Sequence, residues 1–210
     1  MWFNSAMKIC LATENIGKVV EIQALLNGLP ITICTSHDLG IEMNVAETGI
    51  SYRENAYLKA SAYAARTSLP SLGDDSGLEV AALNGAPGLY SNRFAPIQNP
   101  TDKDRRAYLL SLLTTKPHPW TAFFTCAICI CLPNGRHWFF NGHCDGEIIP
   151  IERGTNGFGY DPIFLMSGSN QTMAELPDIE KNKVSHRARA MQNALPLLNK
   201  LILQGKFQVE

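Results

Sequence analysis

This 210-residue sequence lacks a strong net charge, because its 18 lysine and arginine residues are nearly balanced by 19 aspartate and glutamate residues. A formal net charge of −1 gives no global support for coating a nucleic acid, and a small anionic ligand would need only a local basic cluster. The chain also lacks internal repeats, low-complexity segments and a linker between domains. Its length and its 45% hydrophobic content fit one large domain or two small lobes with a sizeable core.

Targeting and membrane-spanning patterns are missing as well. The first residues, MWFNSAM, contain no basic stretch followed by an apolar run, so they do not resemble a secretory signal. The apolar run that ends at Leu132 is too short to cross a bilayer. We therefore expect a soluble, cytoplasmic protein, with residues 1–6 as an N-terminal extension and residues 7–210 as a single domain.

The six cysteines lack the arrangement of a metal site. Cys126 and Cys129 have the CxxC spacing of zinc and redox sites, but neither a second CxxC pair nor a histidine pair follows. The surrounding run TAFFTCAICICL is apolar at nearly every position, as in a strand buried on both faces. A free cysteine behaves as a small hydrophobic residue, so we interpret these cysteines as reduced core thiols, which favours the cytoplasm.

The opening of the chain predicts alternating strands and helices. Residues 8–12 and 31–34 have the composition of strands, and the helix between them has Asn15 as its N-cap and Gly28 at its end. Ser51 and Glu54 form a capping box, which predicts a helix from residue 52 to about residue 66. Such strand–helix–strand units suggest parallel strand pairing.

The second half of the chain predicts antiparallel pairing. The segments 121–132 and 138–144 lie on either side of a Pro-Asn-Gly turn and are typical of a β-hairpin. Thr101 can cap a helix before this hairpin, and Pro196 is expected to break or restart the last helix. The sequence therefore predicts an α/β fold with a mixed parallel and antiparallel sheet flanked by helices.

Residues 72–95, LGDDSGLEVAALNGAPGLYSNRFA, contain an unusual acidic pair. Asp74 and Asp75 are adjacent and are followed at once by Ser76 and Gly77. Two neighbouring carboxylates repel each other, and this repulsion costs little free energy only at a solvated turn or beside a cation. We interpret the pair as an acidic turn at the end of a strand, and both a surface turn and a functional site fit this stretch alone.

Residues 13–18, TENIGK, form a polar turn between the first strand and the first helix. A helix that starts after such a turn presents free backbone N–H groups to an anion, and Thr13, Asn15 and Lys18 add side-chain donors. The turn is not a Walker loop, because it has one glycine and no GK[ST] ending. Residues 13–18 alone are a weak signal, and they indicate an anion site only if other parts of the chain also supply ligand-binding residues.

Two later stretches add aromatic and cationic residues. Residues 154–164, GTNGFGYDPIF, suit a close backbone approach around a flat ligand, with Phe158 or Tyr160 stacking on a base, although a glycine-rich surface loop also fits. Residues 181–190 place His186 and Arg187 in the first turn of a helix, where positive charge opposes the helix dipole unless an anion lies nearby. The misplaced cations favour a function in ligand binding.

These blocks together resemble the inosine triphosphate pyrophosphatase family, also called non-standard purine NTP pyrophosphatases. The resemblance covers nearly the whole chain from about Met7, and it rests on ATENIGK, ENAYLKA, DDSGLEVAALNGAPGLYSNRFA, GFGYDPIF and EKNKVSHRARA. It implies hydrolysis of ITP, dITP and XTP to the monophosphate and pyrophosphate, with Mg²⁺ as cofactor. It also implies a homodimer, a small-molecule partner with neither nucleic acid nor membrane, and an elongated two-lobed domain with a central nucleotide cleft.

The resemblance also implies roles for single residues. Asp75 would be the catalytic carboxylate and a metal ligand, and Glu47 a second metal carboxylate. Taken alone, Glu47 and Lys59 are as readily explained as a solvated loop and helix face. The substrate would be bound by Thr13, Glu14, Asn15, Ile16, Gly17, Lys18, Lys59, Ser76, Phe158, Gly159, Tyr160, Asp161, Lys181, His186 and Arg187.

Three positions depart from the family pattern, and other functions stay open. Glu14 should repel a triphosphate unless it points outward, whereas Asn92 and Ala188 replace small residues without removing a catalytic group. The alternatives are a pyrophosphatase for modified pyrimidines or standard NTPs, and a regulatory module that senses nucleotides without turnover. Asp75 and its expected cationic contacts favour an enzyme, because a sensor need not keep a water-activating carboxylate.

Overall fold

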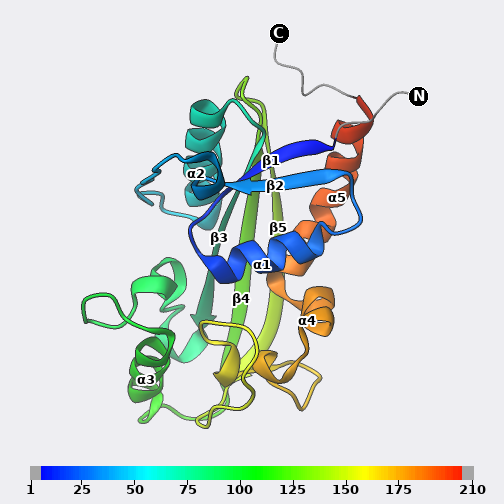
Figure 1. Ribbon diagram of the computed structural model, residues 1–210. Coiled ribbons are helices and arrows are strands. Elements are labelled where there is room, and N and C mark those ends of the chain that lie inside the picture. The colour runs from blue at the N-terminus through cyan, green and yellow to red at the C-terminus, as the bar shows by residue number, and fades with distance from the viewer. Residues whose placement is uncertain (1–5, 205–210) are drawn as a thin grey trace. The chain divides into compact units, whose positions relative to one another are not determined.

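The computed structural model describes residues 6–204 of the chain (Figure 1). The expected N-terminal extension, residues 1–6, lies outside the described residues except for Ala6. The strands are β1 (Met7–Ala12), β2 (Ile31–Thr35), β3 (Ser71–Val80), β4 (Trp120–Cys131), β5 (His137–Ile148) and β6 (Phe164–Met166). The helices are α1 (Ile16–Leu25), α2 (Tyr52–Thr67), α3 (Asp102–Leu113), α4 (Asp178–Val184) and α5 (His186–Gln204). Short 3₁₀ turns are η1 (His37–Leu39), η2 (Ala81–Leu83), η3 (Gly88–Arg93), η4 (Asp161–Ile163) and η5 (Met173–Glu175).

Within the described residues the strands form one mixed sheet in the order β2-β1-β3-β4-β5-β6. β1 pairs in parallel with β2, where Met7 lies opposite Ile31, and also in parallel with β3. β5 pairs antiparallel with β6, where Ile148 lies opposite Phe164. The predicted α/β fold with a mixed sheet flanked by helices is therefore confirmed.

Two local predictions are wrong. Asp74 and Asp75 do not form a turn at a strand end, because β3 runs through both of them to Val80. Pro196 does not end the last helix, because α5 continues past it from His186 to Gln204. At the acidic pair the local turn signal is overridden by the ion pairs that Asp74 and Asp75 form in the folded chain.

The chain divides into two compact units. Unit 1 comprises the residues up to Asp75, residues 127–141 and the residues from Ala190 onward. Unit 2 comprises residues 76–126 and 142–189. The chain passes from one unit to the other within β3, β4, β5 and α5. The cleft that the family resemblance implies stays a prediction.

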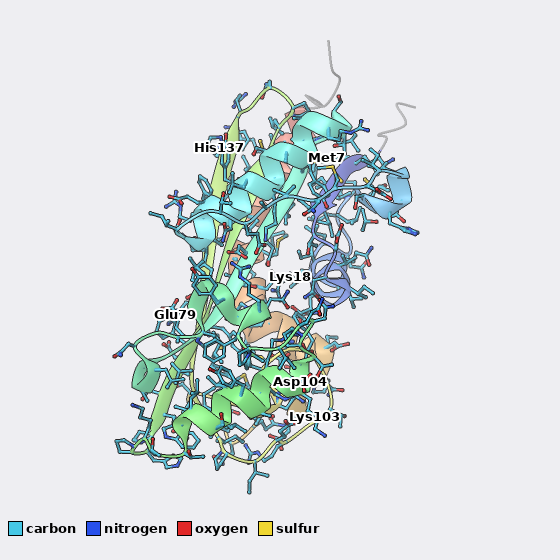
Figure 2. The ribbon with its side chains drawn as sticks, turned by 90° about the vertical axis from the view of Figure 1, so that its left-hand side faces the viewer. Met7, Lys18, Glu79, Lys103, Asp104 and His137 are labelled. Carbon is cyan, nitrogen blue, oxygen red and sulfur yellow. The ribbon has the colours of Figure 1, made fainter. Side chains whose placement is uncertain are left out.

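The core of unit 1 brings α2 very close to the sheet. Ala56, Ala60 and Ala64 recur every four residues on α2 and pack against small residues of β4, which are Ala127, Cys129 and Cys131. A Cβ at Gly73 of β3 would collide with the backbone of α2 at Ala56 and Ala60, so this strand position requires glycine. Figures 1 and 2 show α5 on the opposite face of this part of the sheet.

The core of unit 2 contains larger side chains. Leu109 and Leu113 of α3 are buried against residues of the sheet and of the segment that follows β5. The ring centroids of Phe124 in β4 and Phe164 in β6 lie 4.6 Å apart with the rings tilted. This core holds α3 and the loop before β6 in fixed positions, which matters for the candidate site.

The cysteines lie in these cores, as predicted. All six are free and buried, and Cys10 lies opposite Cys34 in the parallel pair of β1 and β2. Within residues 6–204, no cluster of three or more His, Cys, Asp and Glu side chains is arranged to hold a metal ion. Among the same residues, no helix is long and apolar enough to span a membrane.

Buried thiols of this kind should be chemically inert in the folded protein. Burial raises the pKa of Cys10 and of Cys129 to about 12, and only the thiolate attacks a disulfide reagent. We therefore expect the native protein to react little with dithionitrobenzoate at about pH 8, whereas the denatured protein should release six equivalents of the dye. Rapid reaction of several thiols before denaturation would contradict the assignment of the cysteines to the core.

Candidate active site

Two consecutive carboxylates lie buried in the middle of β3. Successive side chains of a strand point to opposite faces of a sheet, so Asp74 and Asp75 can each contact a different element. Asp74, which is fully buried, forms an ion pair with Lys18 in the first turn of α1. Lys18 also donates a hydrogen bond to the Asp74 carbonyl oxygen at 3.4 Å. Figure 2 shows the position of Lys18 on this helix.

Asp75 is held by two side chains of α2. The Lys59 Nζ atom lies 3.3 Å from Asp75 Oδ1 and 2.5 Å from Glu47 Oε1, so one ammonium group links two carboxylates. The Asn55 Nδ2 group donates to Asp75 Oδ2 at 3.1 Å, and Asn55 Oδ1 accepts from the Gly49 N–H at 2.8 Å. Asn55 and Lys59 are four residues apart and share one face of the helix. Each therefore fixes a different oxygen of Asp75.

Burial and neighbouring charges have opposite effects on the pKa values of Asp75 and Lys59. Burial raises the pKa of Asp75 even though Lys59, Lys18 and the Asn55 amide lower it. Burial lowers the pKa of Lys59, but the carboxylates of Asp75 and Glu47 outweigh this effect and raise it. Lys59 is therefore a firmly protonated ammonium group. Asp75 is a stronger base than an ordinary aspartate, as a proton acceptor near neutral pH should be.

The turn before α1 has the predicted cap. Asn15 Oδ1 accepts from the Lys18 N–H at 3.2 Å, and the Asn15 N–H donates to Thr13 Oγ1 at 3.2 Å. Glu14 is exposed, as is Ile16, and Gly17 is half-buried. Since the first N–H groups of a helix have no partner within it, the start of α1 offers donors to an anion beside Lys18.

A second group of predicted residues lies in unit 2, around the ring of Phe158. The Lys181 Nζ atom is 4.9 Å from the ring centroid and the Arg187 guanidinium carbon is 5.6 Å from it. Arg187, only 1% exposed, donates to Ser76 Oγ at 3.0 Å. Lys181 contacts Asp161 Oδ2 at 2.5 Å. Both cations are thus fixed beside a half-buried aromatic face.

The glycine-rich loop is shaped by Asp161. Its Oδ2 atom accepts from the Phe158 N–H at 2.9 Å while it contacts Lys181. Gly157 has a φ of +72°, and a Cβ there would collide with the Asp161 carboxylate and the Lys181 ammonium group. Glycine is therefore required at this position on both conformational and steric grounds.

Two other predicted residues, His186 and Tyr160, have contacts that define their roles. The His186 ring stacks on Phe124 with centroids 4.6 Å apart and 12° between the planes. Tyr160 is buried, its hydroxyl donates to the Ser91 carbonyl at 2.9 Å, and burial raises its pKa. Tyr160 therefore anchors the loop to η3, and Phe158 is the aromatic side chain of this loop with an exposed part.

The structure brings the predicted residues together in two groups, one in each unit. Asp75, Lys59 and Glu47 form a group beside the Lys18–Asp74 pair, and Phe158, Asp161, Lys181, Arg187 and Ser76 form the other. Sequence analysis missed Asn55. The available signal was its position one helical turn before Lys59 on the same helix face.

Unit 1 of this α/β protein presents buried carboxylates, two lysines and a capped helix start, which suit a phosphorylated ligand. Unit 2 presents an aromatic ring beside two fixed cations, which suits a flat base. The chain matches the family model of the Ham1 family over residues 9–197. It belongs to this family, which confirms the resemblance drawn from the sequence.

Individual relatives match almost the whole chain. A dITP/XTP pyrophosphatase of Geobacter sulfurreducens is 47% identical over 185 residues, which cover 88% of this chain and 92% of that protein. A dITP/XTP pyrophosphatase of Desulforamulus reducens is 43% identical over 198 residues, or 94% of this chain and 98% of that protein. The structure of a HAM1 protein from Coxiella burnetii has a TM-score of 0.83 and 39% identity, and covers 92% of this chain and 99% of that one.

Asn55 should be a major contributor to the stability of the Asp75 group. Asn55→Ala leaves the Gly49 N–H and one Asp75 oxygen without their present partner, so we expect the free energy of unfolding to fall by about 2 to 4 kcal/mol. Asn55→Asp keeps the acceptor for Gly49 but adds a charge beside Asp75, and it should be at least as damaging near neutral pH. Urea unfolding of both variants and of the wild type measures the change in the free energy of unfolding.

A matched control lies on the same helix. Arg66 is exposed near the end of α2, and Arg66→Ala should change the free energy of unfolding by no more than about 0.5 kcal/mol. If Asn55→Ala were no more destabilising than Arg66→Ala, the two Asn55 hydrogen bonds would not hold this part of the structure.

Proposed function

We propose that this protein hydrolyses the non-standard purine nucleoside triphosphates ITP, dITP and XTP to the nucleoside monophosphate and pyrophosphate, and so removes them from the nucleotide pool. The observation that carries the proposal is the buried carboxylate of Asp75, whose two oxygens are held by Lys59 and Asn55. The names of the two relatives described above, both dITP/XTP pyrophosphatases, support the same substrate class.

The phosphates would bind to the cationic side chains of unit 1. Cleavage between the α and β phosphates requires neutralisation of charge and a positioned water molecule. Lys18 and the first N–H groups of α1 would hold the phosphate chain, with Thr13 and Asn15 shaping the turn. An ammonium group has three donors, so Lys18 and Lys59 can contact phosphate oxygens while they keep their carboxylate partners.

Mg²⁺ would be held by Asp75 and Glu47. These carboxylates already share one cation, the Lys59 ammonium group, which shows that both can approach a common positive charge. Mg²⁺ prefers oxygen ligands and usually takes one or two carboxylates together with substrate phosphates. When bound, the ion would supply phosphate charge neutralisation and a more acidic water.

Asp75 would orient the attacking water and accept its proton at a carboxylate oxygen. Lys59 and Asn55 keep that carboxylate from rotating, because each contacts one of its oxygens. A nearby cation stabilises the charged form of a carboxylate and lowers its basicity, whereas burial raises it. The net effect raises the pKa of Asp75, which makes it a stronger base than an ordinary aspartate.

The base would stack on Phe158 in unit 2. Hypoxanthine and xanthine carry a 6-oxo acceptor where adenine carries an amino donor, so donors from Arg187 or His186 favour the oxo group. Adenine would leave buried donors unpaired, which penalises ATP. Ser76 and Asp161 hold Arg187 and Lys181 for this task. GTP shares the 6-oxo group, so its exclusion requires a feature around position 2 of the ring.

The family resemblance further leads us to propose a homodimer in the cytoplasm that acts on a small-molecule substrate, with neither nucleic acid nor membrane as a partner. The near-neutral charge of the chain agrees with the absence of a nucleic-acid partner.

The first test is the release of pyrophosphate and orthophosphate from ITP, XTP, GTP and ATP, each with Mg²⁺ or with EDTA. We expect metal-dependent release of pyrophosphate from ITP and XTP and little from ATP or GTP. Release of orthophosphate would place the attack at the γ phosphate and contradict the proposed bond. Tight binding of nucleotides without turnover would instead favour a nucleotide sensor.

The second test is Asp75→Asn, which keeps the size of the side chain and removes its charge. Loss of a general base should lower the turnover of ITP by a factor of about 10² or more. Glu42→Gln changes an exposed carboxylate of the same unit and should leave turnover unchanged. If Asp75→Asn retained nearly full turnover, Asp75 would not be the catalytic carboxylate.

A further inference from the structure

Arg106 of α3 lies against the glycine-rich loop that carries Phe158. Its Nη1 atom donates to the Gly159 carbonyl oxygen at 2.8 Å, and its Nε and Nη2 atoms each donate to a Glu152 oxygen at 2.9 Å. The hydrogen bonds from Arg106 lower the pKa of Glu152. One guanidinium group therefore ties together two residues that lie seven positions apart in the chain.

Asp102 binds the N–H group of Gly159, whose carbonyl group accepts from Arg106. Asp102 Oδ2 accepts from the Gly159 N–H at 2.7 Å, and Arg105 forms an ion pair with the other oxygen of Asp102. Asp102 and Arg106 are four residues apart and therefore lie on one face of α3. The helix itself starts with a capping box between Thr101 and Asp104, so its first turn is well fixed. We call the pair of Asp102 and Arg106 the Gly159 clamp.

The Gly159 clamp fixes two consecutive peptide planes. In a trans peptide the N–H and C=O groups point in opposite directions, so the bond from Gly159 N–H to Asp102 also sets the direction of the Phe158 carbonyl. That carbonyl accepts from the Asp161 N–H at 3.3 Å, and the Phe158 N–H donates to Asp161 Oδ2 at 2.9 Å. The backbone of Phe158 is thus held on both sides.

Gly159 suits this role because of its conformation. Its φ is +64°, a left-handed value that glycine adopts without the strain of a side chain. A Cβ at this position would have no heavy atom within 4 Å, so space is not what requires glycine there. The clamp and the glycine together turn the chain so that the Phe158 ring lies beside Lys181 and Arg187.

We propose that Asp102 and Arg106 are positioning residues that set the Phe158 ring as the platform for the base. This inference rests on the proposed function. Neither residue contacts the ring; both act through the peptide groups of Gly159. Loosening these peptides moves the ring relative to the cations that would contact the base. The clamp therefore controls binding of the base and leaves the chemistry at Asp75 unaffected.

The experiment compares kcat and KM for ITP in Arg106→Ala, Arg106→Lys, Asp102→Ala and Asp102→Asn. The alanine variants should raise KM by roughly ten- to a hundredfold, the range expected for lost base stacking, with kcat within about twofold of the wild type. Asp102→Asn keeps an acceptor for the Gly159 N–H and should recover most of the loss. Arg106→Lys can reach only one of the two Arg106 partners and should recover part of it.

Two further measurements separate positioning from general damage. Calorimetry should show weaker binding of IMP to the alanine variants, whereas inhibition by pyrophosphate, which carries no base, should be unchanged. Lys103→Ala, an exposed position on the same turn of α3 (Figure 2), should leave all values at the wild-type level. Thermal unfolding identifies any alanine variant that fails to fold. In that case the comparison is made with Asp102→Asn and Arg106→Lys instead.

The outcomes distinguish the clamp from the proposed function. If the wild-type protein neither binds IMP nor hydrolyses ITP, the proposed function fails, and the clamp fails with it. If the wild-type protein does both and folded variants keep the wild-type KM and IMP affinity, the clamp alone is overturned. A fall in kcat at constant KM would also overturn it, because that result indicates loss of active protein.

Discussion

The ion pairs of two buried neighbouring aspartates are the constraint on which the rest of unit 1 depends. Asp74 and Asp75 lie inside β3, and a charge that leaves water must be paired or its burial is strongly unfavourable. Strand geometry points them to opposite faces, and each forms its ion pair with a lysine of a different helix. Lys18 from α1 and Lys59 from α2 meet this requirement. The position of both helices is therefore coupled to the acidic pair.

α2 combines packing and charge pairing on adjacent stripes. Its alanines face the sheet, and the small side chains and Gly73 permit an approach so close that a methyl group on the strand would collide with the helix backbone. Asn55 and Lys59 precede two of these alanines by one residue each, which places them on the neighbouring stripe. The same close approach that fills the core brings an amide and an ammonium group to Asp75. A larger residue at one of the alanines would therefore disturb the Asp75 carboxylate as well as the packing.

Features that depend on neighbouring residues, such as helix caps and strand order, could be predicted from the sequence. The caps Asn15, Ser51 and Thr101 each form the hydrogen bond that their spacing predicts, and the mixed sheet follows from the order of strands and turns. The acidic turn was wrong because adjacent aspartates favour turns in isolation, whereas Lys18 and Lys59 stabilise them in a strand. The Gly159 clamp left no signal, since its partners are more than 50 residues apart in sequence. The motifs identified the candidate residues, but the contacts that support them could be found only in the three-dimensional structure.

The charges of unit 1 give a reason for a divalent cation that does not depend on family membership. Asp74, Asp75 and Glu47 bring three carboxylates to a group in which Lys18 and Lys59 are the ammonium partners. A triphosphate that binds beside these carboxylates is itself strongly anionic, so the two would repel each other. Donors at the start of α1 offset only part of that repulsion, because a helix terminus carries roughly half an elementary charge. A divalent cation held by Asp75 and Glu47, as proposed above, would neutralise part of this charge beside the carboxylate that would activate water.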